Sequence, residues 1–293
     1  MASEHRPLFC SFMNGAPSDN SLVFDRGFAY GDGLFETIHF VNRHAPLWLY
    51  HLQRLERSCK KLQIPLGKSD LALIESNIMS LLGERSGADK KANNTEASHC
   101  IIKIIVTRGA GGRGYALPNP ETRPTIWVGR SEMTPIPKQI TENGVEAGLC
   151  HYRLSENPFL AGIKHLNRLD QVMCARELGH LFELVVLDQH DRVIEGVKSN
   201  LLLFYKDDNV VTPALSVAGV RGVMRQYLLE NSGETGVEII EREISLDELY
   251  KCSGLAFINS VFGVVPVKKL MQRTLAVDFR CRLLQRHCVR LFG

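Results

Sequence analysis

Apolar residues recur at steps of three and four residues between Leu47 and Leu62, a spacing that predicts an amphipathic helix. Arg54 lies off the apolar stripe, beside Leu55, so its guanidinium can point elsewhere. We expect the helix to pack through one face, which contains Leu49, Leu52, Leu55, Cys59 and Leu62.

Short apolar runs rich in β-branched residues predict strands in both halves of the chain. Longer periodic segments predict helices over Leu166–Leu178 and Gly222–Glu230. Because the two kinds of element alternate irregularly, the pattern favours an α+β (mixed α/β) fold and no simple repeat. The expected strands are Cys100–Val106, Thr125–Val128, Glu183–Asp188, Leu201–Tyr205 and Asn209–Thr212.

The length of 293 residues fits two modest domains. Pro135 and Pro137 precede a polar stretch that ends at Gly144, and such a segment suits a connection between domains. We therefore predict a small N-terminal α/β domain over residues 1–134, a linker over 135–144 and a larger C-terminal domain over 145–293. The polar segment Ser86–Ala97 is expected to be a surface loop.

The charge balance argues against nucleic acid as a partner, because 35 Lys and Arg against 32 Asp and Glu give a net charge of only +3. The basic residues are dispersed. The densest group lies near the C-terminus, where it is expected to form the solvated face of a terminal helix. It contains Arg280, Arg282, Arg286 and Arg290.

Eight cysteines include no C-x-x-C pair and no histidine at zinc-finger spacing, so a metal site is not expected. The thiols are interpreted as reduced core residues of a cytoplasmic protein. A secretory leader and an apolar run near 18 residues are both missing, so no membrane association is expected.

Lys164 follows the apolar pair Gly162-Ile163 and precedes a polar helix start, so it could be partly desolvated. Desolvation lowers the pKa of an amine and favours Schiff-base chemistry, although a surface lysine at a turn has the same pattern. Glu195 lies before a tight turn and could pair with a buried cation, or simply belong to a hairpin.

Two glycine-rich segments complete the candidates. Arg108–Tyr115 does not match a phosphate-binding loop, and it suits a flexible loop that carries Arg113 and Tyr115 towards an anionic ligand, or a mobile hairpin with solvated arginines. Asp25–Thr37 places glycines between aromatic and charged residues, which permits close backbone approach or simply makes a turn.

In combination, these segments resemble the fold-type IV family of pyridoxal-phosphate enzymes. Asp25–Thr37 is similar to the family's D-R-G-x-x-Y-G-D-G-x-F-E-T motif, and His51–Leu55 to its H-x-x-R-L motif. Ile194–Asn200 resembles its E-G-x-x-S-N motif, and Lys164 stands at the position of the cofactor lysine. The resemblance implies a two-domain fold similar to D-amino-acid aminotransferase, with a β-barrel-like core in the larger domain.

The resemblance also implies roles. Lys164 would bind pyridoxal phosphate covalently and move protons on the substrate, while Glu195 would face the pyridine nitrogen. Arg54 would bind the phosphate together with the backbone amides that begin the helix at Val223 and Met224, where Met224 replaces the family's usual threonine. The remaining cofactor-binding positions are Ser199, Asn200, Asn259 and Ser260.

Lys164–Gln171 resembles the K-H-L-N-R-L-x-Q motif of bacterial aminodeoxychorismate lyases within this family. That branch converts 4-amino-4-deoxychorismate to 4-aminobenzoate and pyruvate, a step of folate biosynthesis. The resemblance implies that Phe35, Thr37, Arg113 and Tyr115 bind substrate, that Lys164 or Thr37 protonates the leaving group, and that the protein is a homodimer. A branched-chain or D-amino-acid aminotransferase of the same fold is the alternative.

Overall fold

The computed structural model describes residues 11–13, 16–18, 21–83, 98–118, 122–133, 136–206 and 210–292. The expected loop Ser86–Ala97 lies outside these residues, as does Asn209 at the start of one predicted strand. The first described elements are short. They are β1 (Ser11–Met13), β2 (Ala16–Ser18), a 3-10 helix at Ser21–Phe24 and α1 (Arg26–Tyr30).

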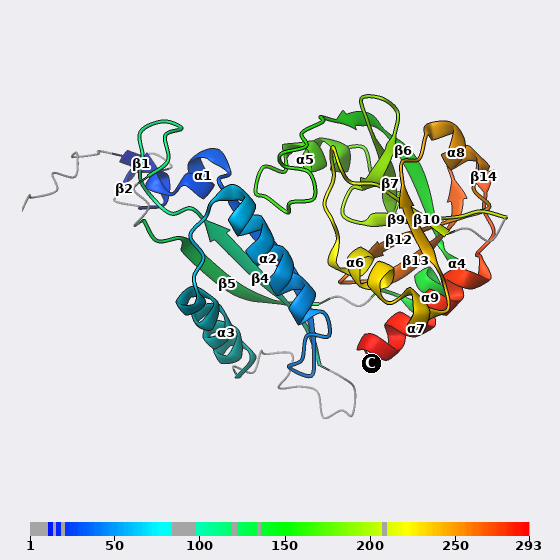
Figure 1. Cartoon of the computed structure of the whole chain (residues 1–293), viewed down its shortest axis with the longest axis horizontal. Helices are drawn as coiled ribbons and strands as arrows, with labels where there is room; N and C mark the ends of the chain where they lie inside the picture. The colour runs from blue at the N-terminus through cyan, green and yellow to red at the C-terminus, as the bar shows by residue number, and fades with distance from the viewer. Residues whose placement is uncertain are drawn as a thin grey trace, which may run out of the picture.

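The N-terminal part of the chain is built on an antiparallel sheet in the order β3-β4-β5. Helices α2 (Trp48–Leu62) and α3 (Lys68–Gly83) pack against this sheet, as Figure 1 shows. Its core contains Leu34, Leu55, Ile74 and Ile102 among others. The strands are β3 (Gly33–Val41), β4 (His99–Thr107) and β5 (Thr125–Glu132), so both strands predicted here are confirmed.

The helix predicted over Leu47–Leu62 is confirmed as α2, and its buried face includes Leu55 and Cys59 of the predicted stripe but differs from that stripe at one end. Leu49 is 67% exposed, whereas the polar residues His51 and Arg54 are buried with Leu55 and Cys59. The prediction was therefore wrong for Leu49. The helix is rotated because His51 and Arg54 meet a buried carboxylate of β3, as described below.

The C-terminal part contains a nine-stranded curled sheet in the order β11-β10-β9-β12-β13-β6-β7-β8, with β14 paired to β13. Alternate side chains such as Val185, Leu201 and Phe257 form a core on one side of the sheet. This is the barrel-like core of the expected fold. The strands are β6 (Val145–Leu154), β7 (Glu183–Asp188), β8 (Val193–Gly196), β9 (Asn200–Phe204), β10 (Val210–Pro213), β11 (Ile239–Arg242), β12 (Gly254–Asn259), β13 (Gly263–Leu270) and β14 (Arg273–Thr274).

Helices α6 and α9 pack on the other face of this sheet, where Phe204, Met224, Ile258 and Leu284 share a second core (Figure 1). The predicted helix over Gly222–Glu230 is thus confirmed. The helices are α4 (Lys138–Asn143), α5 (Leu169–Ala175), α6 (Val223–Glu230), α7 (Ser232–Thr235), α8 (Leu246–Lys251) and α9 (Phe279–Phe292).

Two predictions for this part need correction. The helix expected from Leu166 begins only at Leu169, because the amide of Leu166 donates to the carbonyl of Gly33 and the segment pairs with β3. Arg280 is buried instead of solvated, because it forms an ion pair with Asp278 at 2.7 Å and donates to the carbonyl of Tyr205.

The seven cysteines that the structure describes are all buried, in agreement with their interpretation as core residues. Within the same ranges, no helix is long and apolar enough to cross a membrane. The described residues also include no group of three or more His, Cys, Asp or Glu side chains placed to hold a metal ion.

Candidate active site

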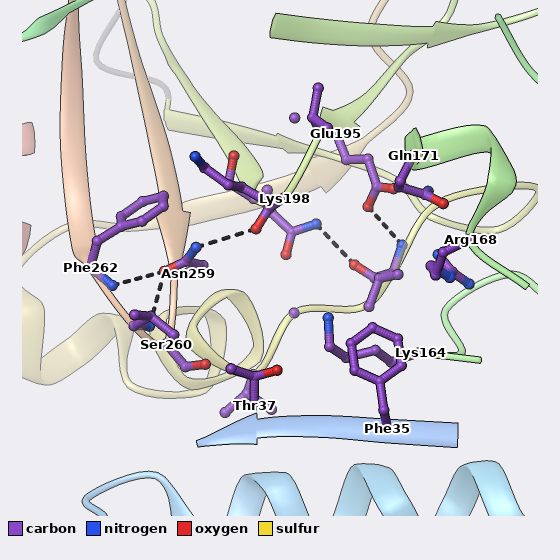
Figure 2. A pocket seen from close by; sticks show the side chains of 18 of the residues that line it. Phe35, Thr37, Lys164, Arg168, Gln171, Glu195, Lys198, Asn259, Ser260 and Phe262 are labelled. Carbon is purple, nitrogen blue, oxygen red and sulfur yellow. Dashed lines mark hydrogen bonds between the residues drawn. The ribbon is translucent and has the colours of Figure 1, made fainter. Parts of the chain in front are cut away.

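A cavity of about 580 Å³ brings the predicted residues together from both sheets. Figure 2 shows Asn259, Ser260 and Phe262 on one side of this pocket and Lys164, Arg168 and Gln171 on the other. Most of the predicted cofactor and substrate residues line it. They are Phe35, Thr37, Arg54, Lys164, Glu195, Ser199, Asn200, Val223, Asn259 and Ser260.

Lys164 is placed by backbone pairing with the first residues of β3. The amide of Phe35 donates to the carbonyl of Lys164 at 3.0 Å, and the neighbouring residue pair Leu34 and His165 forms an antiparallel bridge. The ammonium of Lys164 therefore lies 4.3 Å from the centre of the Phe35 ring. This backbone pairing places Lys164 against β3 of the N-terminal sheet, on one side of the pocket.

The environment of Lys164 favours the neutral amine. Burial lowers the pKa of this lysine to about 8, and the positive charge of Arg54 acts in the same direction, while Glu36 opposes it. An amine of this kind is a better nucleophile and proton acceptor near neutral pH than an exposed lysine.

Glu195 lies in the pocket with only 4% of its surface exposed. Its carboxylate accepts hydrogen bonds from the Val220 amide at 2.8 Å and from the Gln171 side chain at 3.2 Å. Burial raises the pKa of Glu195 to about 6, and the Val220 amide, Arg168 and Gln171 oppose this rise. The carboxylate is ionised at neutral pH and can bind a protonated ring nitrogen.

Arg54 reaches the pocket from α2 and is held by a buried carboxylate. Its guanidinium donates to both oxygens of Glu36, at 2.8 and 2.5 Å, and to the carbonyl of Arg221 at 3.1 Å. His51 makes a third contact with Glu36 at 2.7 Å. Burial alone would raise the pKa of Glu36, but Arg54 and His51 outweigh it and hold the pKa at about 2.

The start of α6 lies beside Arg54. Gly222 is the N-cap and no side chain caps this helix, so the first amides, from Val223 and Met224, are available for an anion. The Asn200 side chain donates to the carbonyl of Val220 at 2.9 Å, and a Cβ on Gly222 would stand 2.0 Å from the Asn200 oxygen. The turn is therefore built around Asn200 and a glycine.

The side chain of Met224 does not line the pocket. It is fully buried in the core beside α9, where the Cys288 thiol lies 3.7 Å from its sulfur. Of Met224, only the backbone amide is therefore available to an anion at this site.

Two further predicted residues shape loops of the pocket. The Asn259 oxygen accepts from the amides of Val261 and Phe262 at 2.9 and 2.8 Å, and its amide group donates to the carbonyl of Lys198 (Figure 2). The Ser199 hydroxyl donates to Glu183 at 2.9 Å. Both side chains thus fix turns that border the pocket.

Arg113 and Tyr115 do not line the pocket of their own chain. Tyr115 is 85% exposed and lies against Tyr30, with ring centres 5.3 Å apart. Arg26 holds the loop by donating to the carbonyls of Gly114 and Ala116. The structure therefore separates these two residues from the other predicted site residues.

Several residues that contribute to the site were not singled out from the sequence. Glu36 and His51 stand inside the N-terminal motifs, but nothing local indicates that they meet Arg54. Arg168 and Gln171 follow Lys164 within the same sequence motif, and this proximity was the available signal that they belong to its site. Lys198 lines the pocket from the turn before β9.

The side chains fit pyridoxal phosphate, which carries an aldehyde, a basic ring nitrogen and a phosphate. Lys164 offers an amine with a lowered pKa, and Glu195 offers a buried carboxylate. Arg54 and the uncapped start of α6 offer a positive cradle for a phosphate.

The comparisons agree with this site. Residues 33–270 match the model of the amino-transferase class IV family. The chain is 32% identical to the aminodeoxychorismate lyase of Vibrio harveyi over 92% of this chain and 94% of the relative. A putative branched-chain-amino-acid aminotransferase of Methanocaldococcus jannaschii is 27% identical over 86% and 83%.

Among solved structures, the 4-amino-4-deoxychorismate lyase of Pseudomonas aeruginosa superposes with a TM-score of 0.81 and 38% identity, covering 94% of this chain and 97% of that one. The family match spans most of the sequence. The chain therefore belongs to the class IV aminotransferase family of pyridoxal-phosphate enzymes.

Proposed function

We propose that this protein is an aminodeoxychorismate lyase, which converts 4-amino-4-deoxychorismate to 4-aminobenzoate and pyruvate for folate biosynthesis. The observation that carries the proposal is its similarity to the lyase of Pseudomonas aeruginosa, 38% identical across almost the full length of both chains. The motif Lys164–Gln171, which surrounds the reactive amine, supports the same branch of the family.

In this proposal the pocket holds pyridoxal phosphate. Arg54, Ser260 and the amides of Val223 and Met224 would hold the phosphate, and Glu195 would hold the ring nitrogen. The Lys164 amine would hold the aldehyde carbon until the substrate amine displaces it and leaves the lysine free. Ser199, Asn200 and Asn259 support the loops that carry these groups. When bound, the cofactor supplies an electron sink for the pair of electrons released at the substrate carbon.

Lys164 then serves as the base. Its neutral amine, favoured by burial, removes the proton from C4 of the substrate, which carries the amino group. The bond between C3 and the enolpyruvyl oxygen breaks, and the ring becomes aromatic. The leaving group takes up a proton on its methylene carbon and departs as pyruvate, with Lys164 or the Thr37 hydroxyl as the proton donor.

Phe35 and Thr37 border the substrate from β3, since both line the pocket beside Lys164 (Figure 2). The centre of the Phe35 ring lies 4.3 Å from the ammonium of Lys164. Glu36, which lies between them in the sequence, points to the opposite face of β3 and fixes Arg54. One strand thus supplies both substrate contacts and the anchor of the phosphate-binding arginine.

A direct assay separates this proposal from the aminotransferase alternative. The purified protein with pyridoxal phosphate is given 4-amino-4-deoxychorismate, and separately D-alanine or leucine with 2-oxoglutarate. We expect 4-aminobenzoate in the first reaction and at most slow glutamate formation in the second. Rapid transamination without 4-aminobenzoate would refute the lyase assignment.

We also propose that the protein is a cytoplasmic homodimer of two-domain subunits, divided at residues 135–144. The exposed Tyr115 and the distance of its loop from the pocket of its own chain support a role for Arg113 and Tyr115 in the neighbouring subunit's site. Mixing Lys164→Ala and Arg113→Ala subunits tests this arrangement. Activity above that of either variant alone is expected, and no recovery after subunit exchange would contradict it.

A further inference from the structure

The substrate class of the proposed function contains two carboxylates, one on the ring and one on the enolpyruvyl group. An anion that enters a partly desolvated pocket needs a compensating charge for each carboxylate. The described lining of the pocket contains the cations Arg54, Lys164, Arg168 and Lys198. Their existing partners decide which of them is available to the substrate.

Most of these cations are already engaged. Arg54 is neutralised by Glu36 and lies at the phosphate cradle. Arg168 donates to the backbone carbonyls of His165 and Ile163, at 2.8 and 3.2 Å, and its charge faces Glu195. Lys164 carries out the chemistry. Each of these three cations therefore already has another role: Arg54 binds Glu36, Arg168 binds backbone carbonyls beside Glu195, and Lys164 serves the reaction.

Lys198 differs from the others. It is exposed at the pocket border, and its ammonium makes no hydrogen bond or ion pair with any residue in the described ranges. The ammonium lies 5.1 Å from the centre of the Phe182 ring, which holds it in place by a cation–π contact. Phe182 in turn packs edge-on against Phe262, which lines the pocket, at 5.7 Å.

The backbone of Lys198 is fixed from both sides. Its amide donates to Glu183 at 3.3 Å, and its carbonyl accepts from Asn259 at 3.2 Å, as the dashed line in Figure 2 shows. The side chain therefore extends from a rigid turn, beside an aromatic surface. A positive charge next to an apolar wall suits a carboxylate on a flat, apolar body.

We propose that Lys198 is a specificity-determining residue whose ammonium binds one carboxylate of the substrate and so favours dicarboxylate over monocarboxylate amines. This inference rests on the proposed function for the identity of the substrate. The binding of the second carboxylate is left to the loop that contains Arg113.

A structural role is the competing explanation, because burial raises the pKa of Glu183, and the charge of Lys198 opposes this rise together with the hydrogen bond from Ser199. Glu183 is already bonded to the amides of Val197 and Lys198 and to the Ser199 hydroxyl, and these bonds do not depend on the ammonium. Thermal stability distinguishes the two roles.

The test compares Lys198→Met, which keeps length and removes charge, with Lys198→Arg, which keeps charge. Lys251→Met is the control, because Lys251 is an exposed lysine of α8 outside the pocket. We expect Lys198→Met to raise KM for 4-amino-4-deoxychorismate roughly 5- to 20-fold with kcat changed less than about threefold. Lys198→Arg should stay within about threefold of the wild type in KM.

Binding to the holoenzyme is measured by calorimetry with chorismate, which keeps both carboxylates but has a hydroxyl in place of the amine. Its Kd should rise with Lys198→Met by a factor similar to that of KM. Binding of the fragments 4-aminobenzoate and pyruvate identifies the carboxylate that Lys198 contacts. If Lys198→Met weakens binding of 4-aminobenzoate, the contact is with the ring carboxylate. If it weakens binding of pyruvate, the contact is with the enolpyruvyl carboxylate.

Unchanged KM and unchanged chorismate affinity in Lys198→Met would overturn the inference. A lower melting temperature with unchanged KM would do the same, as would unchanged binding of both 4-aminobenzoate and pyruvate. A wild-type protein that forms no 4-aminobenzoate refutes the proposed function. Even then, the chorismate titration still tests Lys198, so the two failures are distinguishable.

Discussion

Replacing Glu36 by glutamine removes the negative charge that holds Arg54 and His51 in the interior of the protein. The pKa of Glu36 is held at about 2 against an ordinary value of 4.5. A shift of this size corresponds to roughly 3 kcal/mol of stability. Removal of one partner from a buried ion pair typically costs roughly 3–5 kcal/mol, because the other charge stays buried without compensation. The expected loss of stability in Glu36→Gln is therefore roughly 3–5 kcal/mol.

The sign of the pH dependence follows from the direction of the shift. Because the folded-state pKa is lowered, the stabilisation by Glu36 is complete above pH 4.5 and is lost as the pH falls towards about 2. The difference in stability between the wild type and Glu36→Gln should therefore be constant near neutral pH. It should shrink in the acid range.

The assay is calorimetric unfolding of the protein without cofactor. We expect Glu36→Gln to lower the melting temperature by roughly 6 to 15 °C. Glu132→Gln is the control, because this glutamate is exposed at the end of β5. The double variant Glu36→Leu with Arg54→Met should recover much of the loss, since no unpaired charge remains buried. A melting temperature of Glu36→Gln equal to that of Glu132→Gln would refute this role of Glu36, as would a double variant less stable than Glu36→Gln.

The remaining predictions concern the pocket. In the cofactor-free protein, the rate of Lys164 acetylation is measured by mass spectrometry over a range of pH. The rate should rise with a midpoint near pH 8. A pH dependence equal to that of the exposed Lys251 would contradict the burial of Lys164. Gly222→Ala should weaken retention of pyridoxal phosphate at least tenfold, because the new Cβ would lie 2.0 Å from the Asn200 oxygen. Gly233→Ala is the control and should behave as the wild type, because a Cβ at this position meets no atom within 4 Å. Glu195→Gln should retain bound cofactor yet lose roughly 10²-fold or more in kcat, and turnover within a factor of two of the wild type would exclude its role.

The sequence predicted the elements whose signal is local. The period of α2 and the β-branched runs of β4 and β7 identified these elements because burial follows the repeat of the backbone. Leu49 was misplaced because the periodicity considers only apolar residues, and the buried face of α2 is completed by His51 and Arg54. Apolar periodicity does not identify polar residues that are buried through a partner in another element.

The site was predictable as a set of motifs but not as an arrangement. Read alone, Lys164 had the pattern of a turn lysine, and its burial results from pairing with β3, which lies more than a hundred residues earlier in the sequence. The same long-range pairing shortened the helix expected from Leu166. The Glu36–Arg54 contact likewise joins β3 to α2, and no local pattern indicates it. Arg280 turned inward for a local reason, the carboxylate of Asp278 two residues before it.

The central claim is tested most directly by the stoichiometry of the products. The protein with pyridoxal phosphate is incubated with 4-amino-4-deoxychorismate in the absence of any 2-oxo acid, and 4-aminobenzoate and pyruvate are measured together. We predict equal amounts of the two products over many turnovers, and none from Lys164→Ala. Turnover that requires a 2-oxo acid, or product from Lys164→Ala at the rate of the wild type, would contradict the assignment.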